Sequence, residues 1–87
     1  MNAEAAVVLI VDDIPENLAV LSDTLDAAGY FVLIAVNGRE ALERVRLVKP
    51  DIVLLDAVMP GLDGFEVCRR LKADPSARHI PVVFMTG

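Results

Sequence analysis

The stretch Ile52-Val53-Leu54-Leu55-Asp56 decides the fold, because four apolar residues run without interruption into an acid. An apolar run of this length is typical of a strand that is covered on both faces, as in a parallel sheet. The segment that follows, Ala57-Val58-Met59-Pro60-Gly61-Leu62-Asp63-Gly64, is rich in Pro and Gly and indicates a loop. We therefore expect Asp56 to lie at the end of a strand, beside a surface crevice.

A second apolar run, Val7–Val11, also ends in acids, Asp12 and Asp13. If the two runs are neighbouring parallel strands, three carboxylates converge at one edge of the sheet. Like charges at such a short distance repel one another unless a cation binds between them. Carboxylate oxygens suit Mg²⁺, so we expect a site for Mg²⁺ or Mn²⁺. Asp13 and Asp56 are the expected direct ligands, and Asp12 binds directly or through a water.

Strand and helix patterns alternate along the chain. Strand patterns cover residues 7–11, 30–36, 51–55 and 81–85, and Pro or Gly residues punctuate the helical segments between them. The expected inner positions of the three helices are Leu18, Leu21 and Leu25, then Ala41, Leu42 and Val45, then Phe65, Cys68 and Leu71. This order predicts an α/β fold, a doubly wound parallel sheet with right-handed crossovers. In such sheets, sites lie beyond the carboxyl ends of the strands, where Thr86 is also expected.

Size and composition exclude several classes of protein. The 87 residues make one small domain, with residues 1–6 as an expected tail and 7–87 as the domain. A net charge of −5 argues against nucleic-acid binding, and the apolar runs are too short to span a membrane. Residues 1–6 lack the features of a signal peptide, and the single Cys68 suits a reducing compartment. We expect a cytoplasmic protein.

The motifs resemble the receiver (phosphoacceptor) domain of bacterial two-component response regulators. The matching segments are Val11-Asp12-Asp13-Ile14-Pro15-Glu16-Asn17-Leu18, Asp51-Ile52-Val53-Leu54-Leu55-Asp56, Met59-Pro60-Gly61-Leu62-Asp63-Gly64 and Met85-Thr86-Gly87. The resemblance covers essentially all of residues 7–87. It implies a flavodoxin-like sheet of strand order 2-1-3-4, truncated after the fourth strand and lacking the fourth helix, the fifth strand and the fifth helix of the family.

The resemblance also implies a role for each site residue. Asp56 is the expected phosphoacceptor, Asp12 and Asp13 the acidic metal pocket, the Val58 backbone carbonyl a further metal ligand, and Thr86 the switch hydroxyl. Such a domain is regulatory rather than an enzyme, although its aspartate takes part in its own phosphorylation and dephosphorylation. The expected partner is a histidine kinase or a phosphotransfer protein. The family's lysine at the end of the fifth strand lies beyond these 87 residues.

The missing fifth strand predicts that the fourth strand is an edge. A bare apolar edge strand is a template for pairing with another chain, so self-association into a dimer is expected.

Two other functions compete with the phosphoryl-accepting receiver. One is a metal-dependent phosphohydrolase of the haloacid-dehalogenase type, which places a second acid two residues after its nucleophile, where this chain has Val58. The other is a dimerising or structural module of the same fold without phosphotransfer.

Overall fold

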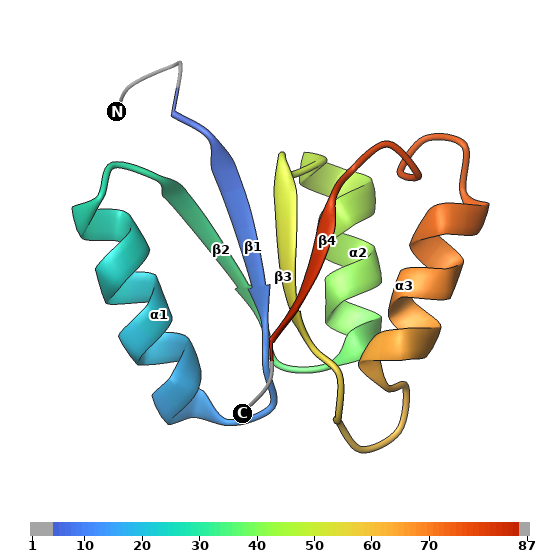
Figure 1. Ribbon diagram of the computed structural model, residues 1–87, viewed down its shortest axis with the longest axis horizontal. Coiled ribbons are helices and arrows are strands. Elements are labelled where there is room, and N and C mark those ends of the chain that lie inside the picture. Colours follow the sequence, from blue (N-terminus) through green and yellow to red (C-terminus); the bar gives the residue numbers. More distant parts are fainter. Residues whose placement is uncertain (1–4, 86–87) are drawn as a thin grey trace.

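In the computed structural model, which describes residues 5–85, four strands alternate with three helices. Their bounds are β1 (Val7–Val11), α1 (Pro15–Ala27), β2 (Phe31–Ala35), α2 (Gly38–Val48), β3 (Ile52–Asp56), α3 (Gly64–Ala73) and β4 (Val82–Met85). All strand pairs are parallel, and the sheet order is β2-β1-β3-β4. The predicted doubly wound sheet is therefore confirmed. One face of the sheet carries α1, and the other carries α2 and α3 (Figure 1).

Alternation along the strands divides the core into two clusters. Leu9 and Val53 point to the α2 and α3 side and are fully buried, whereas Val8 and Ile10 point to the α1 side. The first cluster is the larger and includes helix residues Ala41, Val45, Val67 and Leu71, while α1 contributes Leu18 to the second. Each fully buried aliphatic side chain contributes roughly 1.5–3 kcal/mol. The apolar strands thus hold the sheet between two layers of helix and fix where the strands end.

The inner face of α3 differs from the prediction. Phe65 was expected to be buried, but 62% of its surface is exposed, whereas Val67 and Leu71 are buried and Cys68 is only partly so. Residues four apart share a helix face, so Val67 and Leu71 define the inner stripe. Phe65, two positions before Val67, points away from that stripe. Its ring centroid lies 5.0 Å from that of Phe84 on β4.

Three strand boundaries also differ from the prediction, because β2, β3 and β4 each begin one residue later than expected, and the shift of β3 concerns the site. Asp56 is the last residue of β3 and pairs in register with Met85 of β4, rather than following the strand. Gly38 is the first residue of α2, and Asn37 is its N-cap. The Asn37 side chain accepts a hydrogen bond of 2.8 Å from the backbone N–H of Glu40, which satisfies a free donor of the first helical turn.

Candidate metal site at the carboxyl ends of the strands

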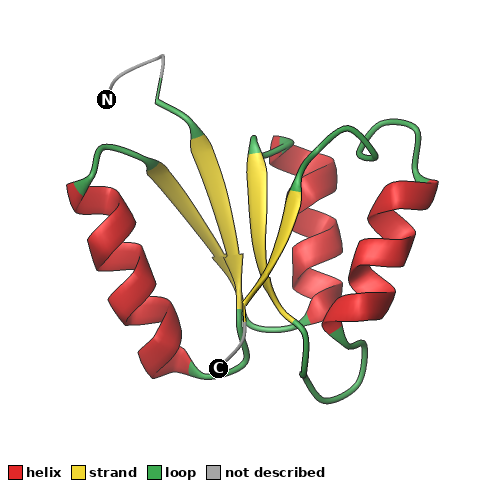
Figure 2. Ribbon diagram, in the orientation of Figure 1, coloured by secondary structure: helices red, strands yellow, loops and turns green. Residues whose placement is uncertain are grey.

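The carboxyl ends of β1 and β3 bring three carboxylates together. The loops that follow both strands leave the sheet at the same end (Figure 2). Val11 pairs with Leu55 in register, so Asp12, Asp13 and Asp56 meet at this edge. Each offers an oxygen atom, and these oxygens all lie within 4.8 Å of one another.

Asp12 is the buried member of this cluster, with only 5% of its surface exposed. Its Oδ1 accepts a hydrogen bond of 2.9 Å from the backbone N–H of Ile14, and its Oδ2 accepts one of 3.1 Å from the side-chain amide of Asn17. The Asp12 N–H donates to the carbonyl oxygen of Ala35 at the end of β2. Both its backbone and its carboxylate are therefore held in one orientation by neutral groups.

Asn17 reaches Asp12 because of the way α1 begins. Pro15 is the first residue of α1, where its missing N–H costs nothing and its ring favours helical φ. Leu18 is buried against β1 and anchors the first turn of the helix on the sheet. Asn17, the residue before this anchor, is exposed and lies beside the acid cluster. The start of α1 thus positions a side-chain donor at the site.

Asp56 is half-buried, and its position depends on a close approach by α3. The backbone N–H of Val58 donates to Asp56 Oδ1 over 3.1 Å. Gly64, the first residue of α3, lies so close that a Cβ there would come within 2.2 Å of the Asp56 carbonyl oxygen. Its N–H also donates to the carbonyl oxygen of Ala57. A glycine at this position lets α3 pack directly against the end of β3.

The other expected site residues are placed as follows. The Val58 side chain is 80% exposed and follows Asp56 by two residues, while Thr86 lies outside the described residues. Asp63 caps α3 by accepting a hydrogen bond of 2.9 Å from the Glu66 N–H, as befits a loop acid that is not a ligand.

Within the described part of the chain, no Lys or Arg side chain forms an ion pair with the acid cluster. Residues 1–38 contain no Lys or Arg, and all 8 of these residues fall between positions 39 and 78. Within residues 5–85, the ion pairs all join side chains of α2 or of α3, and none reaches Asp12, Asp13 or Asp56. Three converging carboxylates with hard oxygen ligands and no ion-pair partner among the described residues fit Mg²⁺ or Mn²⁺.

Two residues of the site, Asn17 and Gly64, were not identified from the sequence as site residues. Asn17 stands five positions after Asp12, and Gly64 closes the Pro- and Gly-rich loop. Asn17 could have been identified because it lies in the first turn of the helix that follows Asp12 and Asp13. For Gly64, the usable signal was the glycine at the junction of loop and helix.

The response regulator receiver domain family matches residues 8–87, and the chain belongs to this family. Response regulator PleD of Caulobacter vibrioides is 51% identical over 83 residues, which cover 95% of this chain and 18% of PleD. The N-terminal domain of a response regulator receiver protein from Methanoculleus marisnigri JR1 has a TM-score of 0.91 at 41% identity, over 93% of this chain and 66% of that one.

A third comparison concerns the metal. The receiver domain of the sensor histidine kinase PA1611 from Pseudomonas aeruginosa PAO1 has a magnesium ion coordinated in its active-site cleft. Its TM-score is 0.89 at 29% identity, over 94% of this chain and 67% of that one. The receiver fold and the family expected from the sequence are thus shown. Among residues 5–85, no helix is both long and apolar enough to cross a membrane.

Proposed function

We propose that the protein is a signalling receiver that accepts a phosphoryl group onto Asp56 from a histidine kinase or a phosphotransfer protein, with Mg²⁺ or Mn²⁺ bound. It then changes conformation or assembly in response. The convergence of Asp12, Asp13 and Asp56 within 4.8 Å, in a chain of the receiver family, carries this proposal. The magnesium ion in the PA1611 receiver supports the choice of metal.

Asp56 is the proposed nucleophile. Its carboxylate attacks the phosphorus of a phosphohistidine, the P–N bond breaks, and the electron pair of that bond stays on the imidazole nitrogen. The product is an acyl phosphate on Asp56. Oδ1 of Asp56 accepts the Val58 N–H, whereas Oδ2 accepts no hydrogen bond from residues 5–85, so Oδ2 is the freer atom to attack.

The proposed metal ligands are the carboxylates of Asp13 and Asp56 and the backbone carbonyl of Val58. Asp12 is proposed to bind the ion directly or through a water. Both of its carboxylate oxygens already accept a protein hydrogen bond. When bound, the ion offsets the charge of the carboxylates and of the incoming phosphoryl oxygens. Thr86 is proposed as the switch hydroxyl that binds a phosphoryl oxygen.

The polypeptide of 87 residues is also proposed to self-associate through β4. In the described structure β4 pairs only with β3, so its outer edge is free. Val83 is 47% exposed and Phe84 38% exposed on this strand.

The cytoplasmic location and the division into a tail (1–6) and a domain (7–87) stay predictions. The absence of nucleic-acid binding and of membrane binding also stays a prediction.

A metal titration followed by NMR tests the proposed pocket. Mg²⁺ should shift the backbone amides of Asp13, Asp56 and Val58 with one saturable curve. The Asp13→Ala variant should lose that curve while keeping the rest of its amide spectrum. An unchanged titration in Asp13→Ala would show that the pocket has been assigned to the wrong residues.

A further inference from the structure

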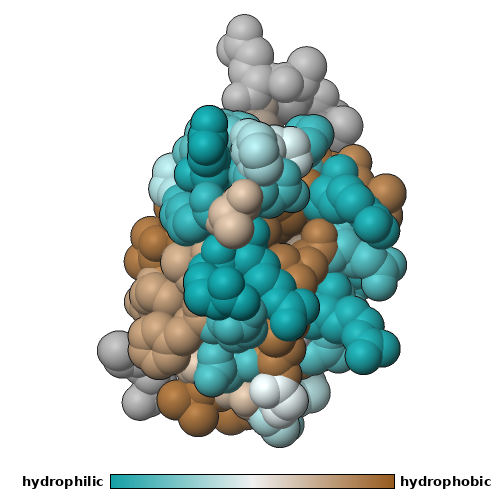
Figure 3. All heavy atoms as spheres, turned by 90° about the vertical axis from the view of Figure 1, so that its right-hand side faces the viewer, coloured by the Kyte–Doolittle hydropathy of each residue, from teal (hydrophilic) through white to brown (hydrophobic). Residues whose placement is uncertain are grey.

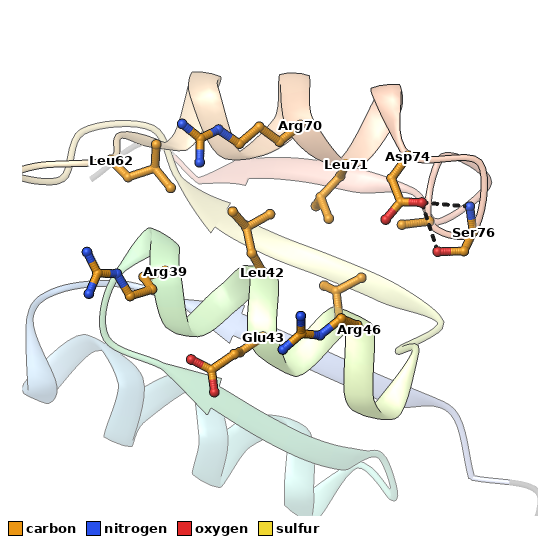
Figure 4. Close-up of a pocket in the computed structure, with 11 residues that line it drawn as sticks. Arg39, Leu42, Glu43, Arg46, Leu62, Arg70, Leu71, Asp74 and Ser76 are labelled. Atoms are coloured by element: carbon orange, nitrogen blue, oxygen red, sulfur yellow. Dashed lines mark hydrogen bonds between the residues drawn. The ribbon is translucent and has the colours of Figure 1, made fainter.

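A hollow between α2 and α3 lies away from the acid cluster. It is an open groove of about 550 Å³. Its apolar lining comes from α2, α3 and the segments that flank α3, and consists of Leu42, Val45, Leu62, Leu71 and Ala77. Figure 4 shows Leu42, Leu62 and Leu71 pointing toward one another across the groove. Hydrophobic side chains are also exposed between hydrophilic ones on the side of the molecule seen in Figure 3.

Three arginines surround this apolar floor. Arg39 and Arg46 lie on α2, and Arg70 lies across the groove on α3 (Figure 4). Within residues 5–85, neither Arg39 nor Arg46 has an ion-pair partner within 4.0 Å. Arg70 shares the single carboxylate of Glu66 with Arg69. The groove therefore has three guanidinium groups, of which Arg39 and Arg46 form no ion pair within residues 5–85, and these three cations outnumber the two acids, Glu43 and Asp74, that also line it.

The spacing of the arginines on α2 indicates which kind of ligand fits the groove. Arg39 and Arg46 are seven residues apart, which puts them on one face of α2 about 10 Å apart along its axis. Leu42 lies between them on the same side. A second helix lying along α2 would match this pattern with acids seven residues apart and apolar residues between them.

We propose that the groove between α2 and α3 binds an acidic amphipathic helix of a partner protein. The partner's apolar side chains rest on Leu42 and Leu62, the two partly exposed leucines of the groove, and its carboxylates bind Arg39, Arg46 and Arg70. This is helix-in-groove recognition, with charge complementarity at the rim. The proposal does not depend on phosphorylation, because none of the lining residues belongs to the acid cluster.

Other anionic partners fit the groove less well. Glu43 and Asp74 also line it, so its three cations face two acids, whereas nucleic acid is bound by an uninterrupted basic face. The Asp74 carboxylate accepts hydrogen bonds from the N–H and the hydroxyl of Ser76, which fixes it at the end of the groove. A membrane surface is bound by side chains that project from a protein, whereas the leucines described above line a groove.

Binding of synthetic peptides to the whole chain tests this proposal. The probe is a helix-forming peptide of about 20 residues, with Glu at positions seven apart and Leu at the third and fourth positions between them. Two matched peptides replace the Glu residues with Lys or the Leu residues with Ala. Fluorescence anisotropy should show saturable binding of the Glu/Leu peptide alone, and binding should weaken as salt rises.

Variants of the protein then locate the site. Arg46→Glu should weaken binding by about tenfold or more, whereas Arg78→Glu, a charge reversal outside the groove, should change it by less than about twofold. Asp56→Asn should bind like the unaltered chain. The proposal is overturned if the Glu/Leu peptide does not bind, if the Lys peptide binds as well, or if Arg46→Glu has no effect. Tighter binding to anionic vesicles or to a single-stranded oligonucleotide would also overturn it.

Discussion

The side-chain amide of Asn17 donates a hydrogen bond of 3.1 Å to Asp12 Oδ2, and with the Ile14 N–H it holds the one buried carboxylate of the acid cluster. Both donors are neutral. Neither donor brings a positive charge that would compete with a divalent ion for the Asp12 carboxylate. A lysine or arginine in place of Asn17 would also hold Asp12, but its positive charge would offset that of the carboxylate, which is the role proposed for the ion.

Replacing Asn17 with alanine should weaken metal binding by about 10- to 100-fold, the usual cost of removing a group that orients a metal ligand. The reason is that Asp12 loses the donor to Oδ2 and becomes free to turn. Mn²⁺ titration followed by electron paramagnetic resonance measures the affinity. Thr24→Ala is the control, because Thr24 lies on the same helix, seven residues after Asn17, and its hydroxyl donates to the carbonyl oxygen of Val20. If Asn17→Ala binds Mn²⁺ as tightly as Thr24→Ala, Asn17 does not position the site.

Replacing Gly64 with alanine should destabilise the fold by about 1–3 kcal/mol, the typical cost of forcing extra volume into a packed region. The added Cβ would meet the carbonyl oxygen of Asp56 at 2.2 Å, so β3 and α3 must separate. Urea unfolding measures the loss of stability, and the amide shift of Asp56 reports the local displacement. Gly29→Ala is a useful contrast, because nothing lies within 4 Å of a Cβ there and only its φ of +97° opposes the change. An undisturbed Asp56 amide in Gly64→Ala would contradict the close packing.

Glu66 should make the stability of the protein depend on acid pH. Hydrogen bonds from Arg69 and then Arg70 lower the pKa of Glu66 from 4.5 to about 2. A carboxylate whose pKa is lower in the folded state stabilises the protein above its unfolded pKa and loses that effect as the pH falls through the folded pKa. The stability difference between the unaltered chain and Glu66→Gln should therefore shrink below about pH 4.5. Because 31% of the Glu66 side chain is exposed to solvent, which screens its ion pairs, the difference is small even at neutral pH.

Urea midpoints at a series of pH values test the role of Glu66. The Arg69→Ala/Arg70→Ala double variant is the control, since it removes the donors and should bring the pKa of Glu66 back toward its ordinary value. A stability difference for Glu66→Gln that stays the same from neutral pH into the acid range would contradict the assigned cause.

The free edge of β4 should make the 87-residue polypeptide dimerise. Exposed apolar strand edges pair with other chains, and a charge placed on such an edge prevents this. Light scattering across a dilution series should show a dimer that dissociates on dilution, and Val83→Lys should shift the equilibrium toward monomer. A well-folded monomer at micromolar concentration would contradict this prediction.

The strands and the meeting of the three acids could be predicted from the sequence because they depend on strong local patterns. Uninterrupted apolar runs mark buried parallel strands, and the topology of such sheets brings their carboxyl ends together. Val7–Val11 is predicted with its observed bounds, and the strand order is correct. The acids then follow from their place directly at the strand ends.

The remaining features depend on packing between elements that are distant in the sequence. The inward face of α3 is set by Val67 and Leu71 against the sheet, and the regular spacing of Phe65, Cys68 and Leu71 gave a misleading signal. The bond from Asn17 to Asp12 requires the exact entry angle of α1, and the role of Gly64 requires the distance between α3 and β3. The arginine-lined groove appears only when α2 and α3 lie side by side. Periodicity within one element does not report such distances.

Chemical mapping of the phosphorylated residue tests the central claim most directly. The protein is incubated with acetyl phosphate and Mg²⁺, the acyl phosphate is reduced with borohydride, and the altered residue is located by tandem mass spectrometry. The proposed function predicts modification at Asp56 alone, lost when Mg²⁺ is chelated and absent in Asp56→Asn. Modification at another residue, labelling that survives Asp56→Asn, or no labelling with Mg²⁺ present would contradict it.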